Sequence, residues 1–190
     1  MGDFLERISK LSPKRLALLA AELQAKVDAF ESQSAEPIAI IGMACRFPGG
    51  VNTPAEFWNL LRSGTDAICE VPPERWDIEA YYDPDPEAPG KMSTRWGGFL
   101  EEVAQFDPQF FGIAPREAVS LDPQQRLLLE VSWEALEHAG LAADQLSGTP
   151  TGVFIGVCGA DYSQLLLERG PATIDAYLAS GTAHSIAAGR

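Results

Sequence analysis

The chain is organised around residues 122–140, which read DPQQRLLLEVSWEALEHAG. This stretch carries the signals of one well-bounded helix. Asp122 can accept hydrogen bonds from the free amides of the first turn, Pro123 suits the first helical position, and Gly140 suits a left-handed stop. The apolar residues cover more than one stripe of the helical surface, whereas a surface helix needs only one. We therefore expect this helix to be buried among other elements.

Apolar segments accompany this helix. The aromatic lead-in FFGI at residues 110–113 precedes it, and GVFIGV at residues 152–157 follows it. The second of these is typical of a strand buried on both faces, and so is IAIIG at residues 38–42. Together with the central helix, these segments predict a layered α/β core.

The remainder of the chain after residue 50 is expected to form short elements. A capping box, Thr53 to Glu56, predicts a helix that ends near Gly64. Residues 66–98 are rich in proline, glycine and aromatic residues, which favours an ordered surface excursion with little regular structure. Further elements are a short strand at 96–100, a short helix from Asp107-Pro108, a helix at 161–168, and a helix from about 173 to the end that breaks at Gly181.

The N-terminal segment has its own helical pattern. Phe4, Leu5 and Ile8 fall on one helical face, and Ser12-Pro13 restarts the pattern as cap and first helical residue. A coiled-coil-like seam follows at spacings of 3, 4, 4 and 3: Leu16, Leu19, Leu23, Val27 and Phe30. Two helices this short cannot bury these faces alone, so they need a partner. The polar run 32–37 then predicts a linker and a domain boundary.

Composition excludes several classes of protein. The 190 residues are 46% apolar and 22% charged, as in soluble globular proteins, and no apolar run is long enough to span a membrane. The first residues are too charged for a signal peptide, so a cytoplasmic protein is expected. The net charge of -13 argues against nucleic acid or an anionic membrane as a partner. Most of this charge lies after residue 36, where nine basic residues face twenty-one acidic ones.

The cysteines and histidines form no catalytic or metal-binding pattern. Cys45, Cys69 and Cys158 are widely spaced, which predicts neither disulfides nor metal ligands but small apolar residues. His138 falls in the last turn of the central helix, where a cation suits the helix dipole. We expect structural roles for His138 and His184.

An ordered series of motifs resembles the ketosynthase domain of modular type I polyketide synthases. The motifs are EPIAIIGMACRFPG at 36–49, FFGIAPREA at 110–118, LDPQQRLLLE at 121–130, WEALE at 133–137 and AAGR at 187–190. The resemblance implies a thiolase-like fold with α-β-α-β-α layers, here incomplete, and a homodimer. It also implies chain elongation in secondary metabolite biosynthesis. A carrier-bound acyl chain would pass to a cysteine and condense, with decarboxylation, with a malonyl-type extender.

The resemblance assigns no catalytic residue to this chain. The family's nucleophile lies in a Thr-Ala-Cys-Ser-Ser context, and its two histidines follow later. All three are expected C-terminal to Arg190, so the 190 residues alone are expected to be inactive. No cofactor is expected to bind directly, because the family's substrates are carried on the phosphopantetheine of acyl carrier proteins.

The first 32 residues resemble the N-terminal docking segment of bacterial polyketide synthase subunits, through LSPKRLALLA at 11–20. The expected organisation is a docking segment at 1–32, a linker at 33–36 and the start of the ketosynthase domain at 37–190. The implied partners are the C-terminal docking tail and the acyl carrier protein of an upstream subunit. Four charges could select an acidic tail: Lys10, Lys14, Arg15 and Lys26.

Alternatives remain open at this point. The N-terminal segment fits a plain dimerising coiled coil, and the whole chain fits a docking and dimerisation scaffold that catalyses nothing. Among enzymes, the ketosynthase of a hybrid peptide synthetase–polyketide system or of a multifunctional fatty acid synthase is the runner-up.

Overall fold

The computed structural model describes residues 6, 9, 11–35 and 37–190 of the chain. The chain divides into two compact units, residues 1–40 and residues 41–190. The predicted helix at residues 3–11 falls largely on Phe4, Leu5, Ile8 and their neighbours, which lie outside the described residues.

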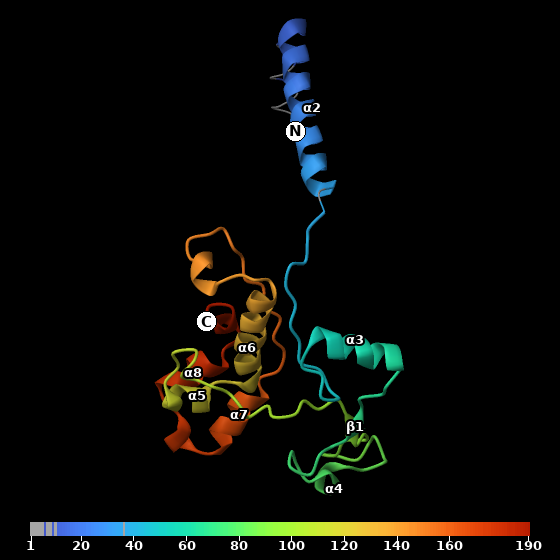
Figure 1. Ribbon diagram of the computed structural model, residues 1–190, viewed down its shortest axis with the longest axis vertical. Helices are drawn as coiled ribbons and strands as arrows, with labels where there is room; N and C mark the ends of the chain where they lie inside the picture. Colours follow the sequence, from blue (N-terminus) through green and yellow to red (C-terminus); the bar gives the residue numbers. More distant parts are fainter. Residues whose placement is uncertain (1–5, 7–8, 10, 36) are drawn as a thin grey trace. The chain divides into compact units, whose positions relative to one another are not determined.

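The first unit is built on the helix α2, Pro13–Ala35 (Figure 1). Ser12 begins it, as predicted: its carbonyl oxygen accepts a bond from the Leu16 amide at 2.9 Å, and its hydroxyl accepts from the Arg15 amide at 3.5 Å. The helix continues through Ala35, so residues 33–35 are helical rather than an irregular linker. Glutamine and alanine sustain a helix, and a helix usually ends before the residue that precedes a proline, here Pro37.

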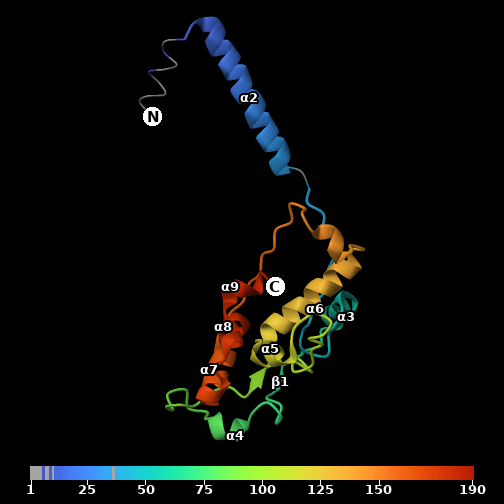
Figure 2. The same ribbon diagram turned by 90° about the vertical axis from the view of Figure 1, so that its left-hand side faces the viewer.

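The second unit consists of short elements joined by turns (Figures 1 and 2). In chain order they are α3 Pro54–Ser63, β1 Cys69–Glu70, α4 Ile78–Tyr81, β2 Trp96–Gly97, α5 Pro115–Ser120, α6 Pro123–His138, the 3-10 helix η1 Ala143–Leu146, α7 Asp161–Glu168, the 3-10 helix η2 Pro171–Thr173, α8 Ala176–Thr182 and α9 His184–Ala187. β1 and β2 pair antiparallel, with Cys69 opposite Gly97. This pair of two-residue strands, with the short helix α4 between them, confirms that the excursion at 66–98 is ordered with little regular structure.

Both capped helices begin and end where the sequence predicts. In α3 the Thr53 hydroxyl accepts from the Glu56 amide at 3.2 Å, while the Glu56 carboxylate accepts from the Thr53 amide at 2.9 Å, and Gly64 ends the helix at φ 64°. In α6 the Asp122 carboxylate accepts from the Gln124 amide at 2.8 Å. Gly140 follows α6 with φ 68°.

The burial of α6 differs from the prediction. Only Gln125 is fully buried on this helix, while Leu128, Val131 and Leu136 are half-buried. Open grooves of about 380 and 300 Å³ lie between α6 and residues 153–157. The apolar face of α6 is therefore only partly covered, because the extended segment beside it does not pack closely against it.

The two predicted strands are extended but unpaired. Within the described residues the only strand ladder is β1–β2, so 38–42 and 152–157 belong to no sheet. Ile38 is 95% exposed and Phe154 94% exposed, which makes the prediction of two buried strands wrong for this structure. A buried strand needs neighbours along its edges and layers over its faces, and no described segment supplies them here.

The best-buried part of the second unit lies where the α5–α6 junction meets α8 (Figure 2). Leu121 and Gln125 are 0% and 2% exposed there, and the Asp122 amide donates to the Gly181 carbonyl at 2.9 Å. Gly181 lies inside α8 and does not break it, contrary to the prediction; the break falls at Ala183. A Cβ on Gly181 would lie 2.2 Å from the Ser120 carbonyl oxygen, so this glycine permits a close approach.

A second, smaller group of buried and stacked side chains involves residues on either side of α3 and the start of the excursion. Val51 and Val71 are buried, and the rings of Phe47 and Phe57 stack with centroids 4.3 Å apart. The predicted helix from Asp107 is instead a series of turns, with the Ile113 amide donating to the Pro108 carbonyl at 2.8 Å. The helix predicted at 161–168 is confirmed as α7.

Candidate functional site

The predicted docking seam lies along α2 with little cover. Leu19 is half-buried, and the other four seam residues are exposed: Leu16, Leu23, Val27 and Phe30. Leu18, outside the seam, is 73% exposed and was not assigned from the sequence. The sequence shows Leu18 only as one residue of a Leu/Ala run. Its exposure could not be predicted, because exposure depends on what packs against the helix.

The predicted docking charges differ in what they contact. The side chains of Lys14 and Arg15 are exposed and make no hydrogen bond or ion pair with any residue that the structure describes. Lys26 is paired with Glu22, one turn earlier, at 2.9 Å. Lys10 lies outside the described residues. Lys14 and Arg15 are therefore the charges most available to a partner.

Within the described residues, the three cysteines make no hydrogen bond with either histidine. All three are free thiols, with Cys45 half-buried and Cys69 and Cys158 exposed. The His138 Nδ1 atom accepts a bond from the Met43 amide at 3.0 Å, and His184 Nε2 bonds the Gly159 carbonyl at 2.6 Å. Both histidines form hydrogen bonds with backbone atoms, which is the structural role expected for them.

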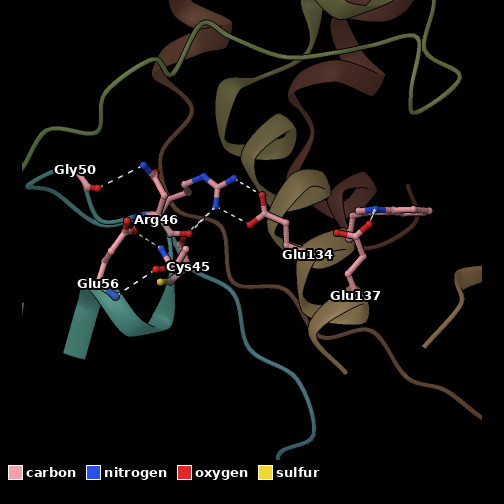
Figure 3. Close-up of polar contacts among 9 residues, drawn as sticks. Cys45, Arg46, Gly50, Glu56, Glu134 and Glu137 are labelled. Carbon is pink, nitrogen blue, oxygen red and sulfur yellow. Dashed lines mark hydrogen bonds and ion pairs between the residues drawn. The ribbon is translucent and has the colours of Figure 1, made fainter. Parts of the chain in front are cut away.

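A polar cluster forms around Arg46 (Figure 3). Its guanidinium faces the Glu134 carboxylate of α6 with two contacts, one of them Nη1 to Oε2 at 2.7 Å. The same Nη1 donates to the carbonyls of Cys45 at 3.0 Å and Asn52 at 3.2 Å. This arrangement ties the chain ahead of α3 to the middle of α6.

The sequence contained both partners of this pair without revealing the pairing. Arg46 and Glu134 each lie within a motif of the family resemblance, but they are 88 residues apart. A separation of this size leaves no local spacing signal.

The pKa values of three titratable groups in and beside this cluster are shifted, and the surroundings of each group explain the direction. Burial raises the pKa of the Cys45 thiol, and the nearby Arg46 opposes this to a lesser degree. Burial likewise raises the pKa of the Glu130 carboxyl, again opposed by Arg46. Hydrogen bonds from the Asn52 amide and from Thr53 lower the pKa of Glu56. A thiol with a raised pKa carries little thiolate at neutral pH, which disfavours Cys45 as a nucleophile.

The cluster offers no set of ligands for a metal. Among the described residues, no group of three or more His, Cys, Asp or Glu side chains is placed to hold a metal ion. A cavity of about 280 Å³ beside it is lined by Arg46, Glu130 and Glu101 among others. The contacts around Arg46 are therefore those of a structural ion-pair cluster.

The chain matches the family "Beta-ketoacyl synthase, N-terminal domain" over residues 35–190. It belongs to this family. All 190 residues align, 54% identical, with a phenolphthiocerol/phthiocerol polyketide synthase of Mycobacterium tuberculosis (strain CDC 1551 / Oshkosh), covering 100% of this chain and 10% of that protein. The pikromycin polyketide synthase component PikAII of Streptomyces venezuelae is 52% identical over 170 residues, covering 89% of this chain and 4% of that protein.

Solved structures of ketosynthase domains share the fold. An oxazolomycin ketosynthase domain of Streptomyces albus JA3453 has a TM-score of 0.68 and 41% identity, covering 80% of this chain and 27% of that chain. The module 6 ketosynthase of the bacillaene synthase of Bacillus subtilis 168 has a TM-score of 0.60 and 35% identity, covering 76% and 24%. The thiolase-like fold class expected from the sequence is thereby confirmed.

The chain spans a tenth or less of the length of these curated relatives. In the part of the chain that the structure describes, no helix combines the length and apolarity needed to cross a membrane.

Proposed function

We propose that this chain forms the N-terminal part of a ketosynthase domain in a modular polyketide synthase subunit. The subunit extends a carrier-bound acyl chain by decarboxylative Claisen condensation with a malonyl-type extender. The observation that carries this proposal is the family match over residues 35–190, together with curated relatives that are polyketide synthases. The names of these relatives favour a polyketide system over a fatty acid synthase.

The nucleophile and its two histidines lie, in this proposal, outside residues 1–190. The absence of a hydrogen bond between any of the three cysteines and either histidine, within the described residues, supports it, because a nucleophilic thiol is commonly activated by an adjacent histidine. The substrates reach the domain on the phosphopantetheine of acyl carrier proteins, and the domain works as a cytoplasmic homodimer.

This proposal is tested by locating the acylated residue. The full-length parent synthase is incubated with an acylated carrier protein, and the acyl group is mapped by peptide mass spectrometry. We expect the label on a cysteine outside residues 1–190 and none on the 190-residue chain alone. We also expect full condensation activity in a parent carrying Cys45→Ala, Cys69→Ala and Cys158→Ala. Stable acylation of any of these three cysteines would contradict the assignment.

The docking role belongs to residues 1–32, and the synthase domain begins at residue 37. The exposed seam of α2 supports it, since an apolar helix face without cover requires a partner. The alignment with the mycobacterial synthase also extends through this segment, because it covers the whole chain. Two copies pair through the seam, and Lys14 and Arg15, with Lys10 and Lys26, select the acidic tail of an upstream subunit.

Titration of candidate tails tests the docking role. Synthetic tails from upstream subunits are titrated into the chain by calorimetry at low and high salt. We expect one tail to bind saturably, more weakly at high salt, and its binding to be lost when Lys14→Glu and Arg15→Glu are combined. Arg62→Glu with Arg169→Glu is the matched control, because both arginines are exposed and the change in net charge is the same. A dimer that binds no tail would leave this segment as a plain coiled coil.

A further inference from the structure

An open groove lies beside strand β1 in the second unit. Its volume is about 810 Å³, and it is lined by residues 66–69, 74–75 and 99–104, with Gly49. That volume is within the range of roughly 300–1,000 Å³ that is common for binding pockets. Phe99, Leu100 and Val103 are half-buried in this lining, and Ile68 is 52% exposed. The groove thus presents apolar surface that the described chain does not cover.

The charged residues of the groove are mostly acidic and mostly unpaired. Glu74, Glu101 and Glu102 are exposed and have no hydrogen bond or ion pair to their carboxylates within the described residues. The cation in the lining, Arg75, donates to the Leu100 carbonyl and so is turned toward the backbone. With Asp66, which accepts from the Ile68 amide at 2.9 Å, four acidic side chains line one groove and create a negative potential that a cationic ligand would relieve.

We propose that this groove docks a segment of a partner protein that presents apolar side chains flanked by lysine or arginine. The apolar lining supplies contact area, and the three carboxylates set the sign of the charge that is accepted. An acidic or phosphate-bearing ligand would meet repulsion at the same place. This inference is independent of the condensation chemistry and of the docking segment, since it depends on Gly49 and residues 66–104.

A model peptide serves as the probe. The peptide is a helix of about 18 residues, with leucine on one face and lysine on the other. Helices of this kind bind apolar grooves through their leucine face. Its binding to the 190-residue chain is measured by fluorescence anisotropy at low and high salt, beside a peptide in which every lysine is glutamate. We expect one-to-one binding of the lysine peptide that weakens with salt, and no binding of the glutamate peptide.

Variants separate this site from a general attraction to an acidic protein. The triple variant Glu74→Lys, Glu101→Lys, Glu102→Lys is expected to weaken binding by at least tenfold. The matched control is Glu87→Lys, Asp144→Lys, Glu168→Lys, which changes the net charge equally at exposed carboxylates outside the groove. Its affinity should stay within twofold of the unchanged chain. Ile68→Ser should weaken binding without changing its salt dependence.

Several outcomes would overturn the proposal. Equal weakening by the two triple variants would show attraction to net charge alone, and binding of the glutamate peptide would show an unselective apolar surface. If the lysine variant fails to fold by circular dichroism, the triple Glu→Gln variant replaces it, with an expected loss of at least threefold. The titration is repeated on the full-length parent synthase. Loss of binding there would show that the synthase itself covers the groove, and the proposal would be wrong.

Discussion

Arg46 and Glu134 form a bidentate ion pair that joins the chain ahead of α3 to α6 (Figure 3). The two side chains are 20% and 37% exposed, so water screens the pair only in part. The guanidinium also donates to two backbone carbonyls, which leaves few of its donors free. The pair is therefore a specific connection between two distant parts of the sequence.

The first prediction concerns the strength of this pair. In a double-mutant cycle with Arg46→Ala and Glu134→Ala, we expect a coupling free energy of about 1–2 kcal/mol, above that of most exposed pairs because the geometry is bidentate. Urea unfolding of the four proteins measures it. Arg46→Lys should recover only part of the loss, since an ammonium cannot make the paired contact. Additive effects of the two alanine changes would contradict the prediction.

The second prediction concerns the pH dependence that Glu130 introduces. Burial raises its pKa in the folded state, so the folded chain holds this proton at pH values where the unfolded chain has lost it. Stability from this group is therefore full at low pH and is lost as pH rises through the raised folded pKa. Glu130→Gln should raise the melting temperature at pH 7, and the gain should vanish below about pH 4. A gain that persists unchanged at low pH would contradict this cause.

The third prediction tests the close approach at Gly181. Its added Cβ would meet the Ser120 carbonyl at 2.2 Å, and neither backbone can yield easily, so Gly181→Ala should destabilise the chain by about 2–3 kcal/mol. The matched control is Gly156→Ala, where an added Cβ meets nothing within 4 Å. Chemical unfolding of both variants measures the difference. Equal stability of the two would show that the α5–α8 contact is loose.

The fourth prediction concerns the geometry of the proposed α2 dimer. Leu16 and Val27 are eleven residues apart, as are Leu19 and Phe30, and an eleven-residue repeat does not favour the left-handed supercoil of a heptad. A heptad would place an apolar residue at Lys26. Lys26→Leu should therefore convert the seam to spacings of 3, 4, 3 and 4 and tighten the dimer about tenfold, as burying one leucine allows.

Sedimentation equilibrium measures the dimer dissociation constant in this test. Gln24→Leu is the control, because it adds the same side chain to α2 outside the seam. Equal tightening by both changes would show unspecific association. No tightening by Lys26→Leu would show that the seam does not pair two copies.

Much of the local structure was predictable because it depends on neighbours in the sequence. The caps at Thr53 and Asp122 and the stop at Gly64 involve residues at most four positions away. The family resemblance was likewise carried by motifs in a fixed order, and the comparisons confirm it. The seam of α2 was predicted from spacing and its docking role from the resemblance of residues 11–20, and that role remains a prediction.

The tertiary structure decided what depends on distant parts of the chain. The pairing of Arg46 with Glu134 and the place of Gly181 within α8 come from contacts that no local spacing encodes. The same holds for residues 38–42 and 152–157, whose apolar composition predicted buried strands. Composition sets whether a segment can be buried, but burial itself requires neighbours on its edges and faces, and the described chain provides none.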